Sequence, residues 1–342
     1  IIGCAYDDIK KVLAYSTVSQ IGYMMLAVGL GPFGYALGIM HLLTHGFFKA
    51  GLFLGAGSVS HGMHGELDIR RMGGLWRKMP ITFVTFGLGY LALIGFPFTA
   101  GYFSKDAIIA AAFGQEGWRG WVFGGAALLG AGITAFYMTR LVLMTFFGKA
   151  RWQELKTADG KEYHPHESPP VMTVPMILLA VGSVGAGAFL ALGDTLAEWL
   201  TPSVGALQES HGGVIGHSLV PFLVVGISAV GVLLAWLFVG RKDVPVERPQ
   251  QVSAVVRAAR ADLYGNALNE ALFARPGIWL SRALVFVDNR GVDGLVNGLA
   301  ALLGGSSGRL RRLQTGFVRS YALTMLIGGF ALVGALLMVR FG

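Results

Sequence analysis

The sequence has 342 residues, of which 54% are hydrophobic and only 13% are charged. A soluble domain carries roughly 25% charged residues, so the composition excludes a soluble fold and predicts an all-α polytopic membrane protein. The net charge of +8 is better explained by basic membrane loops than by nucleic-acid binding. The single cysteine, Cys4, excludes an internal disulfide and a cysteine-ligated metal cluster. The chain begins without Met, in what resembles the tail of a hydrophobic segment, so we expect it to be part of a longer protein.

The first predicted crossing covers about residues 8–30. Asp7 and Asp8 precede it and suit the positive end of a helix dipole, and Lys10 lies in its first turn. Within the apolar run lies a polar stripe that can face a hydrated interior or bond to neighbouring helices: Tyr15, Ser16, Thr17, Ser19 and Gln20.

The second predicted crossing, about 33–60, contains His41, His45 and Lys49 at a spacing of four residues. A helix places this spacing on one face. A lysine near the middle of a membrane costs about 2.5–3.5 kcal/mol, so such a side chain usually faces a wet or protein-lined interior and marks an ion or proton path. The alternative is a lysine that snorkels at a helix end. Two to three turns of apolar sequence follow Lys49 and disfavour that alternative.

Residues 80–113 predict one crossing that is interrupted at Pro97–Gly101, with Lys105 and Asp106 just after the interruption. Two full crossings are the alternative, but the second apolar piece is short for one. A single crossing also places the basic loops on one side, which the positive-inside rule makes cytoplasmic. Charges beside a broken helix are typical of ion sites in transporters. An interfacial charge pair that caps a helix is the competing interpretation.

The next crossing is predicted at about 119–147 and contains Arg140, for which snorkelling towards the cytoplasmic side is favoured over a role in a path. In the polar loop 148–169, His164, His166 and Glu167 resemble a metal-ligand set. Without further ligands at a suitable spacing they favour a solvated loop. Two almost purely apolar crossings at about 170–192 and 216–239 are typical of lipid-facing support.

From about 252 to 312, charged and apolar residues interleave with helical periodicity, which predicts a lateral amphipathic segment. We expect Pro276, Gly291 and Gly304-Gly305 to kink or break it. A final crossing at about 317–339 brings the total to about seven, with the broken one counted once. The chain is thus divided into a transmembrane bundle (1–147), two additional crossings with polar loops (148–250), the lateral segment (251–316) and a C-terminal transmembrane helix (317–342).

Several motifs carry a resemblance to a known family. Asp8-Ile-Lys-Lys-Val-Leu-Ala-Tyr-Ser-Thr17, Ser19-Gln-Ile-Gly-Tyr23, His41-Leu-Leu-Thr-His45-Gly-Phe-Phe-Lys49, Met72-Gly-Gly-Leu75 and Gly101-Tyr-Phe-Ser-Lys105-Asp106 resemble the antiporter-like subunits of respiratory complex I, the NADH-quinone oxidoreductase. The tail, Arg312-Leu-Gln-Thr-Gly-Phe-Val-Arg319-Ser-Tyr-Ala322, is similar to the end of the subunit L family within this group.

The resemblance implies two inverted bundles, each with a broken helix, and a row of buried charges across the membrane. This chain would hold only the second bundle and the lateral element, so the Glu–Lys pair of the first bundle has no counterpart here. By motif match, the resemblance implies that six residues carry protons: Lys10, His41, His45, Lys49, Lys105 and Asp106, with Asp106 as a possible pairing partner of Lys105.

We expect protons to move by titration of buried lysines and histidines, because burial disfavours the charged form of a lysine and histidine ordinarily titrates near neutral pH. The driving energy would come from quinone reduction elsewhere in the complex. The sequence predicts no cofactor and no metal on this chain. The expected partners are other membrane-arm subunits of complex I, membrane lipid and protons, with no nucleic acid, and the expected location is the bacterial inner (plasma) membrane.

Two alternatives stay open at this point. One is the homologous large subunit of a multi-subunit Na⁺/H⁺ antiporter, which shares the His/Lys and Ser-Lys-Asp patterns but against which the tail argues. The other is a structural brace of the membrane arm without transport of its own, which leaves the charges inside apolar helices unexplained. A membrane-embedded hydrolase is disfavoured, because neither paired carboxylates nor an HExxH motif is present.

Overall fold

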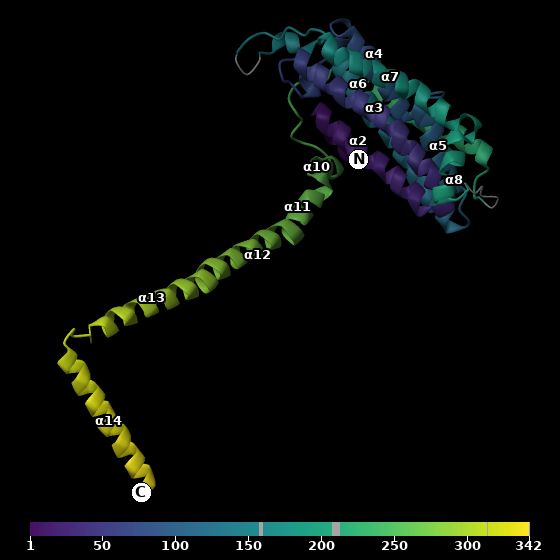
Figure 1. Ribbon diagram of the computed structural model, residues 1–342. Helices are drawn as coiled ribbons and strands as arrows, with labels where there is room; N and C mark the ends of the chain where they lie inside the picture. The colour runs from purple at the N-terminus through teal and green to yellow at the C-terminus, as the bar shows by residue number, and fades with distance from the viewer. Residues whose placement is uncertain (157–159, 207–212, 313, 342) are drawn as a thin grey trace. The chain divides into compact units, whose positions relative to one another are not determined.

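The computed structural model describes residues 1–156, 160–206, 213–312 and 314–341. These residues form helices, with two isolated bridge pairs and no β-strand among them. The chain divides into two compact units, Ile1–Leu263 and Tyr264–Gly342, each described by itself below (Figure 1). The predicted all-α membrane fold is confirmed, whereas the finer division at residues 147, 250 and 316 stays a prediction.

Six helical spans of the described chain are long and apolar enough to cross a membrane: Ile9–Gly29, Tyr35–Gly62, Gly120–Phe146, Pro170–Val204, Val220–Gly240 and Val318–Phe341. The first five of these spans lie in the first unit, where their helices pack side by side (Figure 1). These are α2 (Ile9–Gly29), α3 (Tyr35–Gly62), α6 (Gly125–Phe146, after a π-helical turn at Gly120–Gly124), α7 (Pro170–Ala191) and α9 (Val220–Ala235, continued by a π-helical turn at Trp236–Gly240). Apolar side chains on the facing surfaces of these helices and of α4 (Pro80–Ile94) form the core, among them Phe48, Leu52, Phe86, Met138 and Phe146.

The interrupted crossing consists of α4 (Pro80–Ile94) and α5 (Ala100–Phe113). At about 1.5 Å per residue, their 15 and 14 residues are each too short for a hydrocarbon core of about 30 Å. Between them the backbone takes left-handed conformations at Gly95 (φ +77°) and Phe98 (φ +66°). The helix is thus interrupted at residues 95–99, which overlaps the predicted break at Pro97–Gly101 but begins two residues earlier.

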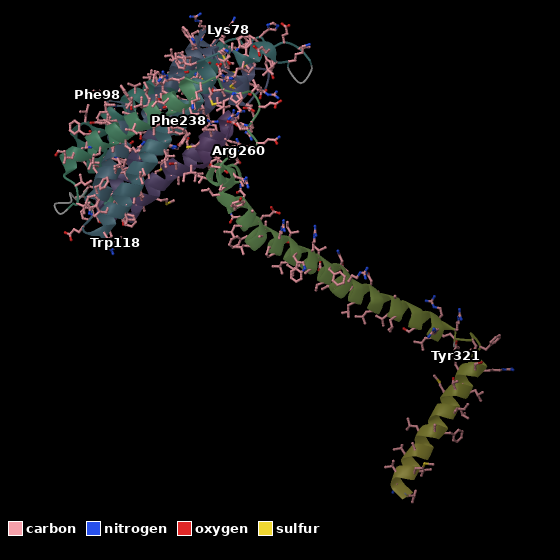
Figure 2. All side chains as sticks on the ribbon, turned by 180° about the vertical axis from the view of Figure 1, so that it is seen from behind. Lys78, Phe98, Trp118, Phe238, Arg260 and Tyr321 are labelled. Atoms are coloured by element: carbon pink, nitrogen blue, oxygen red, sulfur yellow. The ribbon has the colours of Figure 1, made fainter. Side chains whose placement is uncertain are left out.

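Contacts between loops show that α4 and α5 form one crossing. At one end of the bundle, Gly73 N–H donates to Thr145 O (3.2 Å), and Ile81 N–H at the start of α4 donates to Glu167 Oε2 (2.8 Å). At the other end, the carbonyl of Phe113 at the close of α5 accepts from Val214 N–H (3.0 Å). Figure 2 accordingly shows Lys78 and Trp118, which flank the pair, at opposite ends of the bundle.

Basic residues concentrate at the end that carries Lys78, here named the basic end. Its loop residues include Arg70, Arg71, Arg77, Lys78, Lys149 and Arg151. At the opposite end, the described connecting segments 30–34, 114–119, 192–206 and 213–219 contain Arg119 as their sole Lys or Arg. The positive-inside rule predicts that the basic end is cytoplasmic.

Two side chains differ from their predicted surroundings. Arg140 does not snorkel, because its guanidinium is buried, forms an ion pair with Asp7 and donates from Nη1 to Tyr6 O (2.7 Å). Glu167 does not simply face solvent. Its carboxylate caps the first turn of α4 by accepting from Ile81 N–H, Thr82 N–H and Thr82 Oγ1.

The shorter helices of the first unit flank this bundle. They are α1 (Ile2–Ala5), α8 (Thr195–Val204) and α10 (Ala254–Arg260), together with 3₁₀ turns at Gly31–Phe33, Ile69–Arg71, Leu75–Arg77, Arg151–Glu154, Leu192–Asp194 and His217–Leu219. Leu196 and Leu200 of α8 pack with Ala36 and Met40 of α3. Asp262, which follows α10, accepts hydrogen bonds from Tyr6 Oη (2.8 Å) and Tyr15 Oη (2.5 Å).

The amphipathic stretch is interrupted at a place that its proline and glycines do not mark. Three consecutive residues at Asp262–Tyr264 have positive φ, between 51° and 61°, whereas α11 (Gly265–Asn269), α12 (Arg275–Phe286) and α13 (Asp293–Arg311) are joined by π-helical turns at Glu270–Ala274 and Val287–Val292. The expectation of a kink or break therefore holds only in part. The helix is not broken at any of these places, but π-helical turns widen it just before Pro276 and at Gly291, whereas α13 continues through Gly304-Gly305.

The physical reason lies in the wider turns. In the first of them, Arg275 N–H donates to Glu270 O, five residues back, so the backbone has already widened when it reaches Pro276, which has no N–H to donate. In the second, Gly291 is itself part of the π turn. The second unit ends in the apolar helix α14 (Val318–Phe341), which fits the predicted final crossing.

Candidate functional site

Lys49 lies inside the bundle on α3, with its side chain turned towards α2. It is only 6% exposed, so the snorkelling alternative is wrong. Its ammonium donates to Leu13 O (3.1 Å) and to Ser16 Oγ, and it lies 5.8 Å from the centre of the Phe53 ring. The partners of this buried cation are therefore dipoles and a ring face, without a carboxylate.

One and two turns earlier on α3 lie His45 and His41. Their ring centres are 6.0 Å apart, as the four-residue spacing predicts. His41 is fully buried. Its Nε2 lies 3.1 Å from Gln20 Oε1 on α2, and its Nδ1 lies 2.9 Å from Ser104 Oγ on α5. His45 Nε2 is buried without a hydrogen-bond partner among the described residues.

Ser104 can serve both protonation states of His41. It accepts from Thr44 Oγ1 (2.9 Å) and lies 3.1 Å from the carbonyl of Ala100. When His41 is neutral with its proton on Nε2, the Ser104 hydroxyl can donate to Nδ1. When His41 is protonated, Nδ1–H donates to Ser104, whose own proton can turn to Ala100 O.

Lys105 is fully buried on α5, immediately after the break. Its ammonium donates to Leu93 O (3.3 Å), a carbonyl in the last turn of α4 that the break leaves without a helical partner. It also lies 5.6 Å from the centre of the Tyr23 ring, and Tyr23 Oη donates to Ala127 O (2.6 Å). The interruption thus supplies both the space and the acceptor for the lysine.

Asp106 is buried, but it does not form the ion pair with Lys105 that its neighbouring position allows. No carboxylate–amine contact between them falls within 4.0 Å, and neither carboxylate oxygen has a hydrogen-bond partner among the described residues. Buried polar groups are ordinarily satisfied by protein or by ordered water. The surroundings of Asp106 therefore favour hydration.

These groups form one buried polar row across three helices, defined by Ser16 and Gln20 of α2, His41, His45 and Lys49 of α3, and Ser104 and Lys105 of α5. Sequence analysis predicted the α3 face and both lysines. It noted Ser16 and Gln20 only as part of a stripe, and gave no role to Tyr23 or Ser104. The spacing of Ser16, Gln20 and Tyr23 places these three polar side chains on one helix face. This spacing could have indicated that they face the buried row.

Lys10 is not part of this row. It is exposed in the first turn of α2, where its backbone N–H and that of Lys11 donate to the capping carboxylate of Asp8. In the described chain no group of three or more His, Cys, Asp or Glu side chains could hold a metal ion, and this includes the loop with His164 and His166.

A second buried charge cluster, at the basic end, was missed by sequence analysis. Asp7 is fully buried and forms ion pairs with Arg140 and with two loop residues, Arg70 (Nε–Oδ2, 2.8 Å) and Arg248 (Nε–Oδ2, 2.7 Å). Burial acts to raise the pKa of Asp7, but the Arg140 and Arg70 guanidiniums outweigh it and hold the pKa below its usual range. This carboxylate is fixed in its charged form.

Comparisons with known proteins identify relatives of this chain. Residues 1–130 match the family described as "NADH:quinone oxidoreductase/Mrp antiporter, TM". The chain is 59% identical over 99% of its length to NADH-quinone oxidoreductase subunit L of Mycobacterium tuberculosis, covering 52% of that protein. It is 38% identical over 97% of its length to subunit L of Neisseria meningitidis, covering 53%.

Among solved structures, the Mrp complex from Dietzia sp. DQ12-45-1b matches with a TM-score of 0.52 and 25% identity, over 85% of this chain and 32% of that one. The chain spans about half the length of the curated relatives it matches. The motifs, the interrupted crossing and these matches agree, and the chain belongs to the subunit L family of antiporter-like NADH-quinone oxidoreductase membrane subunits.

Proposed function

We propose that the chain carries protons through the membrane as a subunit of NADH-quinone oxidoreductase, a proton-translocating enzyme. The energy comes from quinone reduction on other subunits, and this chain binds no redox cofactor. Its partners are the other membrane-arm subunits, lipid and protons, and its location is the bacterial inner membrane. The names of its relatives support the assignment to this enzyme.

The observation that carries the proposal is the partner set of the two buried lysines. Lys49 and Lys105 meet carbonyls, a hydroxyl and aromatic faces. A dipole stabilises an ammonium but does not lock it, because it imposes no opposite charge that deprotonation would strand. Burial disfavours the charged form of an amine, so both lysines are suited to release and regain a proton.

Between the lysines, the buried polar row supplies groups that both donate and accept. A proton released at Lys49 can be taken up by His45 or, through Ser16 and water, by groups further along α2. His41 can take up the proton at Nδ1 while the Ser104 hydroxyl turns to Ala100 O, and it then gives the proton up to water that leads towards Lys105. Hydration at the unpartnered groups of Gln20, His45 and Asp106 bridges the remaining gaps. Lys10, exposed at the basic end, is assigned to the aqueous entrance only.

The antiporter alternative shares this architecture, as the likeness to the Mrp complex illustrates. The two proposals differ in the ion that moves. Proton pumping by the intact enzyme that is unchanged when Na⁺ is omitted supports the subunit L assignment, whereas strict Na⁺ dependence supports the antiporter.

The decisive experiment uses the complete enzyme in proteoliposomes, with two changes at one position. Lys49→Met removes the amine at similar length. Lys49→Arg keeps the charge on a group that does not deprotonate in proteins. Both are expected to lower NADH-driven proton uptake by about tenfold or more, the range expected when an acid–base group is lost. The measurements are quenching of a pH-sensitive dye and the rate of NADH oxidation.

Lys78→Met provides the matched control, because Lys78 is exposed at the basic end and touches no member of the buried polar row. It is expected to pump normally. Assembly of each variant is checked by the subunit composition of the purified complex. Normal pumping by both Lys49 variants in fully assembled enzyme would refute the proposal and would leave the structural-brace interpretation.

A further inference from the structure

An apolar groove of about 500 Å³ lies on the flank of the first unit, between the α4–α5 break and α9. Its lining residues include Ile94, Phe96, Pro97, Val225, Ala229 and Trp236. Two lining side chains carry a hydroxyl and both are already engaged, Ser228 Oγ with Ile94 O (3.2 Å) and Tyr90 Oη with Thr139 Oγ1 (2.8 Å). The groove therefore has the chemistry of a site for a hydrocarbon chain.

The groove opens on the outer surface of the bundle. Phe96 and Leu233 are each 51% exposed and Trp236 is 46% exposed, although all three lie in or beside membrane-spanning helices. On α9, Val225 and Trp236 are 11 residues apart, which corresponds to about 16 Å along a helix. A hydrocarbon core of about 30 Å contains two leaflets of about 15 Å. The groove is thus one leaflet deep, from the break at mid-membrane to the basic end.

Two positively charged side chains, Arg241 and Lys242, lie where the groove reaches the basic end. The Arg241 guanidinium stacks 5.3 Å from the centre of the Trp236 ring, which itself lines the groove, and Lys242 lies 5.8 Å from the Phe238 ring. Both cations are exposed, and Phe238 is itself 58% exposed. Two cations at headgroup level directly above an acyl-sized groove are complementary to an anionic phospholipid.

We propose that this groove binds one anionic phospholipid of the cytoplasmic leaflet, with an acyl chain along α9 and the phosphate at Arg241 and Lys242. The proposal requires that the chain lies in a membrane and does not depend on proton transport. It also gives the lipid a structural task. The acyl chain would fill the space beside Gly95–Pro97. The turn of α4 that precedes this segment presents Leu93 O to Lys105. An occupied groove would thereby support the break next to the buried lysine.

The test uses the complete enzyme in phosphatidylcholine vesicles that contain a small fraction of phosphatidylglycerol with a photoreactive group at the end of its acyl chain. Labelled peptides are mapped by mass spectrometry. The variants are Ala229→Phe, which fills the groove, and Val230→Phe as its matched control, because Val230 is exposed on the same helix but does not line the groove. At the headgroup, Arg241→Gln with Lys242→Gln is compared with Lys78→Gln.

We expect label on the α4–α5 break and on 225–236 in the unchanged enzyme, at least about five times weaker in Ala229→Phe and in the double Gln variant, and unchanged in the two controls. A phosphatidylcholine probe is expected to label the same peptides more weakly. Equal labelling by both lipids, with no effect of the double Gln variant, would show bulk lipid only and overturn the proposal. Protection from both lipids, with crosslinks to a neighbouring subunit, would overturn it in favour of a protein partner.

Discussion

At the scale of single residues, this protein holds buried charge in two different ways. Asp7 is surrounded by Arg70, Arg140 and Arg248, so its charge is fixed by opposite charges. The direct partners of Lys49 and Lys105 are dipoles and aromatic rings instead, and the Asp106 carboxylate lies near Lys105 but beyond ion-pair distance. Removing one member of an ion pair strands the other in a low dielectric, whereas a lysine among dipoles can lose its proton without that cost. The contrast separates a structural cluster from a site suited to titration.

The Asp7 cluster leads to a prediction about pH. Because the pKa of Asp7 is lower in the folded protein than its ordinary value, its contribution to stability is present above the unfolded pKa, about 3.9, and is lost as pH falls through the folded pKa. Asp7→Asn leaves Arg140 buried without its carboxylate and is expected to cost about 3–5 kcal/mol at pH 7. Scanning fluorimetry of the purified complex should show this loss at pH 7 and a difference from the unchanged protein that shrinks as the pH falls below the unfolded pKa of about 3.9.

Asp8→Asn is the control for this comparison. Asp8 accepts only backbone N–H groups at the start of α2, and asparagine caps helices about as well as aspartate, so little change is expected at either pH. A constant difference between Asp7→Asn and the unchanged protein from pH 7 to pH 3 would show that the carboxylate charge does not stabilise this end of the bundle.

Sequence alone predicted the residue pattern where the relevant spacing is local. The face of His41, His45 and Lys49 follows from helical geometry. The partner of Arg140 is 133 residues away in the chain, and no periodicity reports such a contact, which explains why snorkelling was the favoured interpretation for this arginine. Lys10 shows a second limit of sequence-based prediction. Its place in a family motif predicted a role in the proton path, but a motif does not report burial, and Lys10 is exposed.

At the scale of elements, the break between α4 and α5 depends on close backbone approach. A Cβ added at Gly101 would lie 1.9 Å from Ala92 O, so the start of α5 fits against the end of α4 only with glycine there. The sequence predicted this break because proline and glycine interrupt an apolar run. For the lateral segment it predicted two distorted places, near Pro276 and at Gly291, but not that π-helical turns let the helix continue through them.

Gly101→Ala is therefore expected to destabilise the bundle by about 1–3 kcal/mol, the usual cost of overpacking. It should also lower proton pumping, since α5 must shift and carries Lys105 away from Leu93 O. Thermal unfolding and dye quenching on the same preparation measure the two effects. Gly87→Ala on α4 is the matched control, because a Cβ there meets nothing within 4 Å. It is expected to be neutral or to stabilise by about 0.5–1 kcal/mol. Equal behaviour of the two variants would mean that the approach of α5 to α4 is not needed.

At the scale of the whole molecule, charge distribution and helix count depend on each other. If residues 80–113 cross once, Lys78 and Arg119 lie on opposite faces of the membrane, and Lys149 returns to the face of Lys78. If these residues crossed twice, Lys78 and Arg119 would share a face. The loop hydrogen bonds Gly73–Thr145 and Phe113–Val214 favour one crossing, and the clustering of Lys and Arg at the basic end orients it towards the cytoplasm.

Single cysteines test this arrangement directly. In a Cys4→Ala background, Lys78→Cys, Arg119→Cys and Lys149→Cys place thiols at exposed positions. A membrane-impermeant maleimide is expected to label Lys78→Cys and Lys149→Cys in inverted vesicles, and Arg119→Cys only in intact spheroplasts. Labelling after detergent treatment confirms that each thiol is reactive. Labelling of Arg119→Cys from the same face as Lys78→Cys would contradict the interrupted crossing. It would also separate Lys105 from the helices that hold Lys49 and His41, because a second full crossing would carry α5 back towards the basic end.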